Sequence, residues 1–191
     1  MLIEKSLTFL SGELEAFLKQ RMGDNGNKER IVLSNIVKQN GEIAIGNDQA
    51  AIMLVNIEEE SSRKSQNAFV KNGDGVHQKV NPELLLNLFL LIAANFVKYE
   101  ESLKTISHVV SFYQSRSVFD RTQYPEMDAS LSKLTINLQT MNFEQMNHLW
   151  GALGAKYMPS VLYKMRALVV QEAEIKDEVL PIEEINIESG M

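Results

Sequence analysis

The sequence predicts an α+β fold in which helices flank a mixed or mainly antiparallel sheet. Apolar residues recur at helical spacing in some segments and alternate at strand spacing in others, and these segments follow the order α-β-β-β-α-β-α-β. A length of 191 residues favours one domain. We expect this domain over residues 1–172, followed by an extended acidic tail over residues 173–191.

The first helix is expected from residue 3 up to Gly23. Lys19 and Arg21 lie in its last turn, where cations are favourable, and Gly23 is placed to end it. The apolar residues recur at spacings of three and four, as on the buried face of an amphipathic helix. They are Ile3, Leu7, Leu10, Leu14, Phe17 and Leu18.

Three strands are expected next, over residues 30–39, 50–60 and 81–96. The first is rich in β-branched residues, and the second is apolar at both parities, which indicates that both its faces are covered. Between them, Asn40-Gly41 suits a tight type I′ turn. Residues 81–96 could also form a helix, but apolar side chains would surround that helix completely, so a strand is favoured.

The second half alternates helices and strands. Residues 99–116 have a helical apolar stripe, and residues 131–141 alternate as a half-exposed strand. Asn142 is a suitable N-cap with Gln145 three residues later, so a helix begins there, with Phe143, Met146, Trp150 and Leu153 on one face. Gly154 is expected to end that helix, and residues 160–172 form the last strand.

Composition excludes several classes of function. The chain has no cysteine, which excludes thiol catalysis and disulfides and fits a cytosolic origin. The N-terminus has no continuous apolar stretch typical of a signal peptide, and the most apolar run, residues 84–97, is too short to span a bilayer. From Glu172 onward the net charge is −6, whereas the preceding residues are neutral. A neutral body lacks the basic field of a nucleic-acid-binding protein, so neither nucleic acid nor membrane insertion is expected.

No catalytic, cofactor-binding or metal-binding residues are predicted. The histidines at 77, 108 and 148 are not at metal-ligand spacing and are more simply surface or half-buried residues. Catalysis by His148 with a remote acid stays open, because catalytic triads are assembled in space. Neither a nucleophile elbow nor a phosphate-binding loop is present. We therefore expect a protein that is not an enzyme.

Contact surfaces are the remaining use for the polar segments. Residues 61–80 form a long polar stretch without a regular pattern, which we expect to be an arm that reaches a neighbouring subunit. The acidic tail carries regularly placed aliphatic residues and could lie along a sheet edge as an added strand. A solvated strand end is the simpler alternative for Glu58–Glu60. The candidate interface residues are Glu58, Glu59, Glu60, Arg63, Lys64, Phe69, Lys164, Arg166, Ile182 and Ile185.

The segments "SLTFLSGELEAFLKQR", "LNLFLLIAANFVKYEESLKTISHVVSFYQ" and "FEQMNHLWGALGAKYMPSVLYKMRALVVQE" carry a family resemblance. They resemble the tail-terminator or cap proteins of extracellular contractile injection systems, the phage-tail-like particles of the virulence-cassette and antifeeding-prophage type. The likeness covers about residues 2–172 and does not extend to the loop at 61–80 or to the tail.

The resemblance implies a structural protein with an α/β-like, tail-terminator-like fold and no catalytic residues. It implies a homohexameric ring on the distal end of the inner tube and sheath, where it ends polymerisation and contacts the tube and sheath proteins. Assembly would take place in the cytoplasm, and the particle would then be released or anchored at the cell. A baseplate or sheath-adaptor protein of the same particle is the first alternative, and a small-molecule-binding enzyme is the second.

Overall fold

A computed structural model describes residues 2–23, 28–60, 69–71, 77–79, 84–169 and 178–179. In chain order its elements are α1 (Leu2–Met22), β1 (Ile31–Leu33), β2 (Gln49–Glu59), β3 (Phe69–Lys71), β4 (His77–Lys79), β5 (Leu84–Asn95), α2 (Tyr99–Ser115), β6 (Val118–Asp120), β7 (Leu131–Leu138), α3 (Phe143–Leu153), β8 (Ser160–Val169) and β9 (Glu178–Val179).

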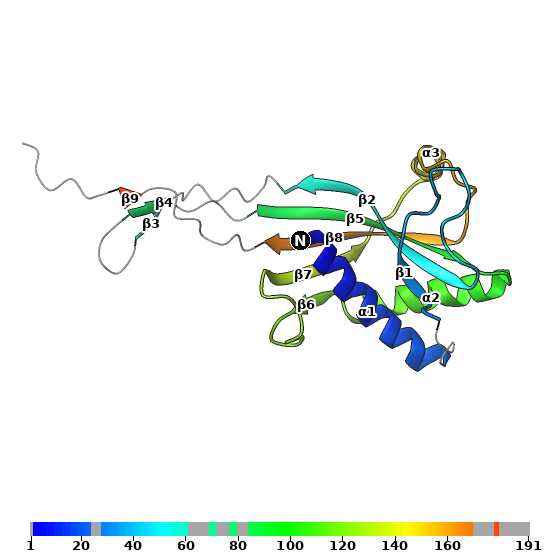
Figure 1. Cartoon of the computed structure of the whole chain (residues 1–191), viewed down its shortest axis with the longest axis horizontal. Coiled ribbons are helices and arrows are strands. Elements are labelled where there is room, and N and C mark those ends of the chain that lie inside the picture. Colours follow the sequence, from blue (N-terminus) through cyan, green and yellow to red (C-terminus); the bar gives the residue numbers. More distant parts are fainter. Residues whose placement is uncertain are drawn as a thin grey trace, which may run out of the picture.

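Six strands form the main sheet in the order β1-β2-β5-β8-β7-β6. β1 is parallel to β2 and every other neighbouring pair is antiparallel, so the predicted mixed sheet flanked by helices is confirmed. α1 and α2 lie on one face of the sheet and α3 lies on the other (Figure 1). The strand expected over residues 81–96 is also confirmed, because β5 pairs with β2 on one side and β8 on the other.

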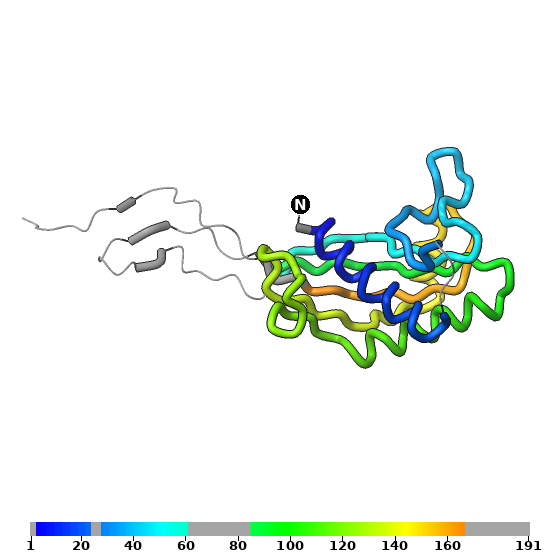
Figure 2. The backbone as a smooth tube through the Cα atoms, turned by 60° about the horizontal axis from the view of Figure 1, so that its bottom comes forward, coloured from blue at the N-terminus to red at the C-terminus, as the bar shows by residue number. Residues whose placement is uncertain are grey.

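The core consists of two clusters on opposite faces of the sheet. The larger lies between the sheet and the helices α1 and α2, and α1 crosses that face along much of its length (Figure 2). Leu10 and Leu14 of α1 and Phe112 of α2 are fully buried there. The smaller cluster, around Trp150 of α3 and Ile36, covers only one end of the opposite face. The apolar stripe predicted for the first helix is therefore confirmed as its packing face.

The strand predicted over residues 30–39 is wrong beyond Leu33. The chain leaves the sheet there because Ile36 and Ile45 are buried beneath α3 in the smaller cluster. The turn at Asn40-Gly41 is not type I′, because only Gly41 has a positive φ, of 83°. Instead, the Lys38 carbonyl oxygen accepts from the Gly41 amide at 3.0 Å, and the Lys38 amide donates to the Glu42 carbonyl oxygen at 2.8 Å. This is the pattern of a three-residue hairpin loop.

The expectation that residues 61–80 lack regular structure is only partly correct. β3 and β4 lie in this segment and pair with each other, and β9 of the acidic tail pairs with β4 in a second, three-stranded sheet. Backbone pairing between these segments agrees with the expectation that the tail adds a strand to a sheet edge. The short strand β6, with its buried Phe119, was not predicted.

Glu15 of α1 fixes the start of β1. Its Oε2 accepts hydrogen bonds from the backbone amides of Arg30 and Ile31, both at 2.9 Å, and its side chain is 11% exposed. Lys19, one turn further along α1, lies 3.5 Å from the other carboxylate oxygen. The carboxylate therefore satisfies two backbone donors at the sheet edge that have no strand partner on that side.

We expect Glu15→Ala to lower the free energy of unfolding by about 2–3 kcal/mol, because two amides bonded to a charged acceptor lose it in a largely buried place. Urea denaturation followed by circular dichroism measures this change. Gln20→Ala, on the exposed side of the same helix, is the control and should leave the midpoint close to that of the unmodified protein. Equal midpoints for the two variants would contradict the role of Glu15.

Both predicted ends of α3 are confirmed. The Asn142 side chain accepts from the Gln145 amide at 2.8 Å, and the Asn142 amide donates to the Gln145 side chain at 3.1 Å, which completes a capping box. Gly154 ends the helix in the left-handed conformation with φ of 64°. Side chains other than glycine are strained in this conformation.

Gly154→Ala should therefore destabilise the protein by about 1 kcal/mol. Gly151→Ala, three residues earlier in the same helix, should stabilise it by about 0.5–1 kcal/mol, because helix propensity improves there. A new methyl group would meet nothing within 4 Å at either position, so backbone conformation alone distinguishes the two variants. Thermal or urea unfolding of the pair measures the difference, and shifts in the same direction would contradict the explanation.

Candidate assembly surfaces

The α3 side of the main sheet is left uncovered at the end away from α3. No described helix lies over this part of the sheet (Figure 1). We call the residues of β2, β5, β7 and β8 whose side chains lie on this side, together with Glu60, the open sheet face. Strand register places them in two rows across the sheet, which are Glu58–Asn87–Arg166–Thr135 and Asn56–Phe89–Lys164–Asn137.

Glu60 joins the strands of the open sheet face. Its Oε2 lies 3.1 Å from the Arg166 guanidinium on β8 and accepts a hydrogen bond of 3.1 Å from the Asn87 side chain on β5. The Glu60 side chain is 19% exposed and that of Arg166 is 51% exposed. The carboxylate is therefore held at the sheet surface while the guanidinium still reaches solvent, where a partner can contact it.

The second row combines a cation with an aromatic ring. The Lys164 ammonium lies 5.7 Å from the centre of the Phe89 ring, within the range of a cation–π interaction. In the first row, Asn87 is only 4% exposed and its Oδ1 has no hydrogen-bond partner. A buried acceptor without a partner costs free energy, so packing alone does not explain an asparagine here.

The structure brings together four of the predicted interface residues, Glu58, Glu60, Lys164 and Arg166. Their side chains share the open sheet face, which the alternation of the last strand predicted for Lys164 and Arg166 alone. Glu59 faces the opposite side, because it is paired with Leu86, whose side chain packs against the larger cluster. The backbone of Phe69 lies in β3. Arg63, Lys64, Ile182 and Ile185 lie outside the described residues. The interface role of all ten stays a prediction.

Sequence reasoning did not identify the exposed apolar side chains at the sheet edges and on α3. Leu33 is 41% exposed, Leu138 is 56% exposed and Phe143 is 87% exposed. Phe143 was grouped with Trp150 on one helix face, but only Trp150 is buried, because Phe143 is the first residue of α3 and projects beyond the core. A large aromatic residue directly after an N-cap was the available signal.

The three histidines lie on three separate elements. His108 lies half-buried on α2 and His148 lies exposed on α3, whereas only the backbone of His77 is described, in β4. Burial, and to a smaller extent the nearby Tyr163, raises the pKa of Tyr113, and burial raises the pKa of Tyr163 to about 12. Both phenols therefore stay protonated at neutral pH.

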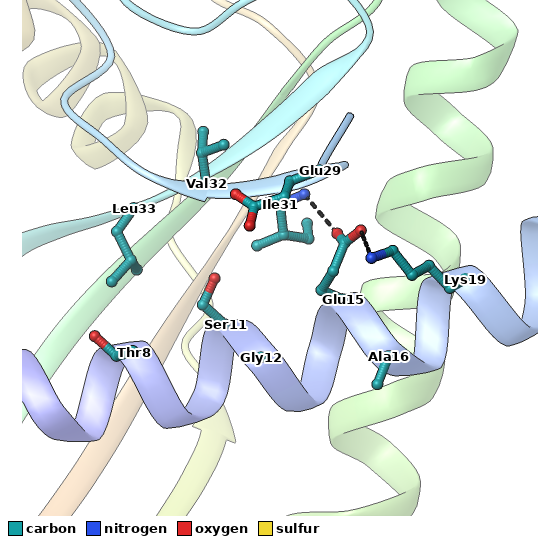
Figure 3. A pocket seen from close by; sticks show the side chains of 10 residues that line it. All are labelled: Thr8, Ser11, Gly12, Glu15, Ala16, Lys19, Glu29, Ile31, Val32 and Leu33. Atoms are coloured by element: carbon teal, nitrogen blue, oxygen red, sulfur yellow. Dashed lines mark hydrogen bonds and ion pairs between the residues drawn. The ribbon is translucent and has the colours of Figure 1, made fainter. Parts of the chain in front are cut away.

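A cavity of about 650 Å³ lies between α1 and β1 (Figure 3). Small side chains of α1 line one side, and the Glu15 carboxylate beside it is already bonded to backbone amides and close to Lys19. No group of three metal-ligating side chains occurs among the residues that the structure describes. Within that same part of the chain, no helix has the length and apolar character needed to span a membrane.

Comparison with known proteins identifies relatives of the chain. Residues 8–184 match the family model described as the Pvc16 N-terminal domain. Among the curated proteins, none matches the sequence.

Two solved structures are similar in fold. The first is the sheath/tube terminator, in the extended state, of the extracellular contractile injection system PVC, with a TM-score of 0.66 and 12% identity over 99% of this chain. The second is the tube-terminating cap of the anti-feeding prophage, with a TM-score of 0.53 and 13% identity over 93% of this chain. This chain spans 63% of the length of the terminator and 59% of that of the cap. The likeness confirms the predicted fold class.

Proposed function

Because the chain belongs to the Pvc16 N-terminal domain family, we propose that it is a structural subunit that ends the tube and sheath of a contractile injection system. The family resemblance carried by the sequence is confirmed by this match. The names of the two similar structures, a sheath/tube terminator and a tube-terminating cap, support the role. The observation that carries the proposal is the family match over residues 8–184, nearly the whole chain.

A terminator has to bind the last layer of a polymer and offer no binding site for the next layer. The open sheet face suits the first task, because its charged groups are held on a rigid sheet by the Glu60 contacts with Asn87 and Arg166. Charged residues that reach solvent favour a polar partner surface and steer its approach. We infer that this face contacts the tube or the sheath, with Lys164 and Arg166 meeting acidic groups.

The proposed assembly is a homohexameric ring on the distal end of the particle. A ring is a closed assembly with head-to-tail contacts, so each copy needs two different and complementary surfaces. The arm at residues 61–80 and the acidic tail are proposed to extend these contacts to neighbouring subunits. The ring would form in the cytoplasm and leave the cell, or remain attached to it, as part of the particle. No enzymatic step is part of the proposed role.

Particle length tests the proposal directly. Particles assembled without this subunit should have a broad distribution of tube and sheath lengths, because polymerisation then lacks a defined end, and restoring the subunit should narrow the distribution. Electron micrographs of the particles measure it. A gold-labelled subunit should appear at the end opposite the baseplate. Normal length without the subunit would contradict the proposal, and label at the baseplate would favour the adaptor alternative.

The double variant Lys164→Gln/Arg166→Gln tests the open sheet face. We expect it to fold with a loss of about 1 kcal/mol or less, because exposed ion pairs contribute little to stability. Co-sedimentation with tube and sheath should fall strongly. Lys98→Gln/Arg121→Gln removes the same charge from exposed positions outside this face and should sediment normally. Equal sedimentation of the two double variants would rule out this face as the contact.

A further inference from the structure

The two edges of the main sheet are stepped at opposite ends. β1 pairs with β2 only at residues 50–52, so the outer edge of β2 has no paired strand over residues 53–58 among the described residues. β6 pairs with β7 only at residues 133–135, so the outer edge of β7 is unpaired from residue 137 to its end within that same part of the chain. We call these stretches the β2 step and the β7 step.

Strand register shows that β1 and β6 lie at opposite ends of the sheet. Residues 50–52 of β2 are level with residues 92–94 of β5. Residues 133–135 of β7 are level with 166–168 of β8, which pair with 85–87 of β5. Each edge therefore has a three-residue strand at one end and a step at the other, with the order reversed between the two edges (Figure 1).

Both steps present backbone groups outward. The Ser34 amide donates to the Ile52 carbonyl oxygen at 3.3 Å, so the backbone amide and carbonyl groups of Ile52 point to the outer edge of β2. The backbone groups of Leu54, two residues later, point the same way. The Ile136 amide donates to the Ser117 carbonyl oxygen at 2.8 Å, so the backbone groups of Ile136, and those of Leu138 two residues later, point outward from β7. Outward amide and carbonyl groups of an edge strand are a template for pairing with another strand.

Each step also has a cavity and an exposed apolar side chain. A cavity of about 470 Å³ lies where β1 ends beside Met53 and Leu54, next to the 41% exposed Leu33. A cavity of about 370 Å³ lies where β6 begins, next to the 56% exposed Leu138. The Tyr113 hydroxyl group in the lining of the second cavity is buried and has no hydrogen-bond partner. The steps therefore present apolar surface together with hydrogen-bonding groups.

We propose that the two steps join copies of this chain head to tail. β6 of one copy occupies the β2 step of the next copy, and β1 of that next copy occupies the β7 step of the first. β1 and β6 run in the same direction, because β1 is parallel to β2 and four antiparallel pairings lead from β2 to β6. They can thus lie end to end in one shared strand position, between β7 of the first copy and β2 of the next. We call this position the shared layer. The inference rests on the proposed ring and specifies its subunit contact.

A second copy fits the steps better than an unrelated strand. An unrelated strand fills one step and leaves the other open, whereas a copy of this chain offers a short strand to each step. The contact joins two different edges, so it is heterologous and can close into a ring. Because β1 and β6 of neighbouring copies share one position, each copy adds five strand positions to the ring. With ~4.8 Å between neighbouring strands, six copies would form a closed sheet with a diameter of about 45 Å.

Cysteine cross-linking tests this contact, because the chain has no cysteine of its own. Leu33→Cys and Leu138→Cys are made as separate variants and mixed during ring assembly. Both side chains are exposed and belong to the larger-cluster side of the sheet. A short bismaleimide should give a covalent dimer in the mixture and none with either variant alone, because the contact is heterologous. One chain with both cysteines should give a ladder that stops at the copy number of the ring.

Ile57→Cys mixed with Leu138→Cys is the matched control, because both side chains are exposed but lie at opposite ends of the shared layer. This pair should remain monomeric on a denaturing gel. Closed rings seen by electron microscopy without the Leu33–Leu138 cross-link would overturn this contact and leave the ring intact. A dimer from Leu138→Cys alone would show a two-fold contact and also overturn it. Absence of rings, with or without tube and sheath, would overturn the proposed function as well.

Discussion

The strand β5 imposes the constraint on which the rest of the structure depends. It lies in the centre of the sheet, pairs on both sides, and is apolar at most positions, so both its faces need cover. Leu88, Leu90 and Ile92 are fully buried on the side of α1 and α2, and Leu91 is fully buried on the other side. Hydrophobic burial around this strand therefore decides where the helices pack and where the chain must leave the sheet.

The cover is unequal, and this inequality creates the surface available for assembly. α1 and α2 supply enough apolar area for one face, whereas α3 and residues 34–48 cover only one end of the other face. Where the cover stops, β5 changes character, with the half-buried Phe89 and the buried Asn87 in place of aliphatic residues. Glu60 then accepts from the Asn87 amide group and pairs with Arg166, so the uncovered part of the sheet carries polar groups held in place on its surface.

The edges of the sheet are governed by a second physical requirement. An exposed edge strand invites unspecific pairing, and short edge strands limit it. β1 and β6 are three residues long, and Glu15 occupies two outward amides at the start of β1. A β-bulge between Leu54 and Asn56 further interrupts the regular edge of β2. These features limit the length of edge strand that is free for unspecific pairing.

The sequence by itself determined the local elements that depend on spacing and capping. The apolar stripe of α1, the capping box and Gly154 of α3, and the alternation of Lys164 and Arg166 along β8 each depend on residues close in the chain. The family also followed from the sequence, and the match of residues 8–184 to the family model confirms it. Only the tertiary structure decided that Glu58, Glu60, Lys164 and Arg166 share one face while Glu59 faces away. It also decided that the strand after Arg30 ends at Leu33 and that Leu33 and Leu138 border steps at opposite edges. These features depend on pairing between residues far apart in the chain and on where burial stops, which no local pattern encodes.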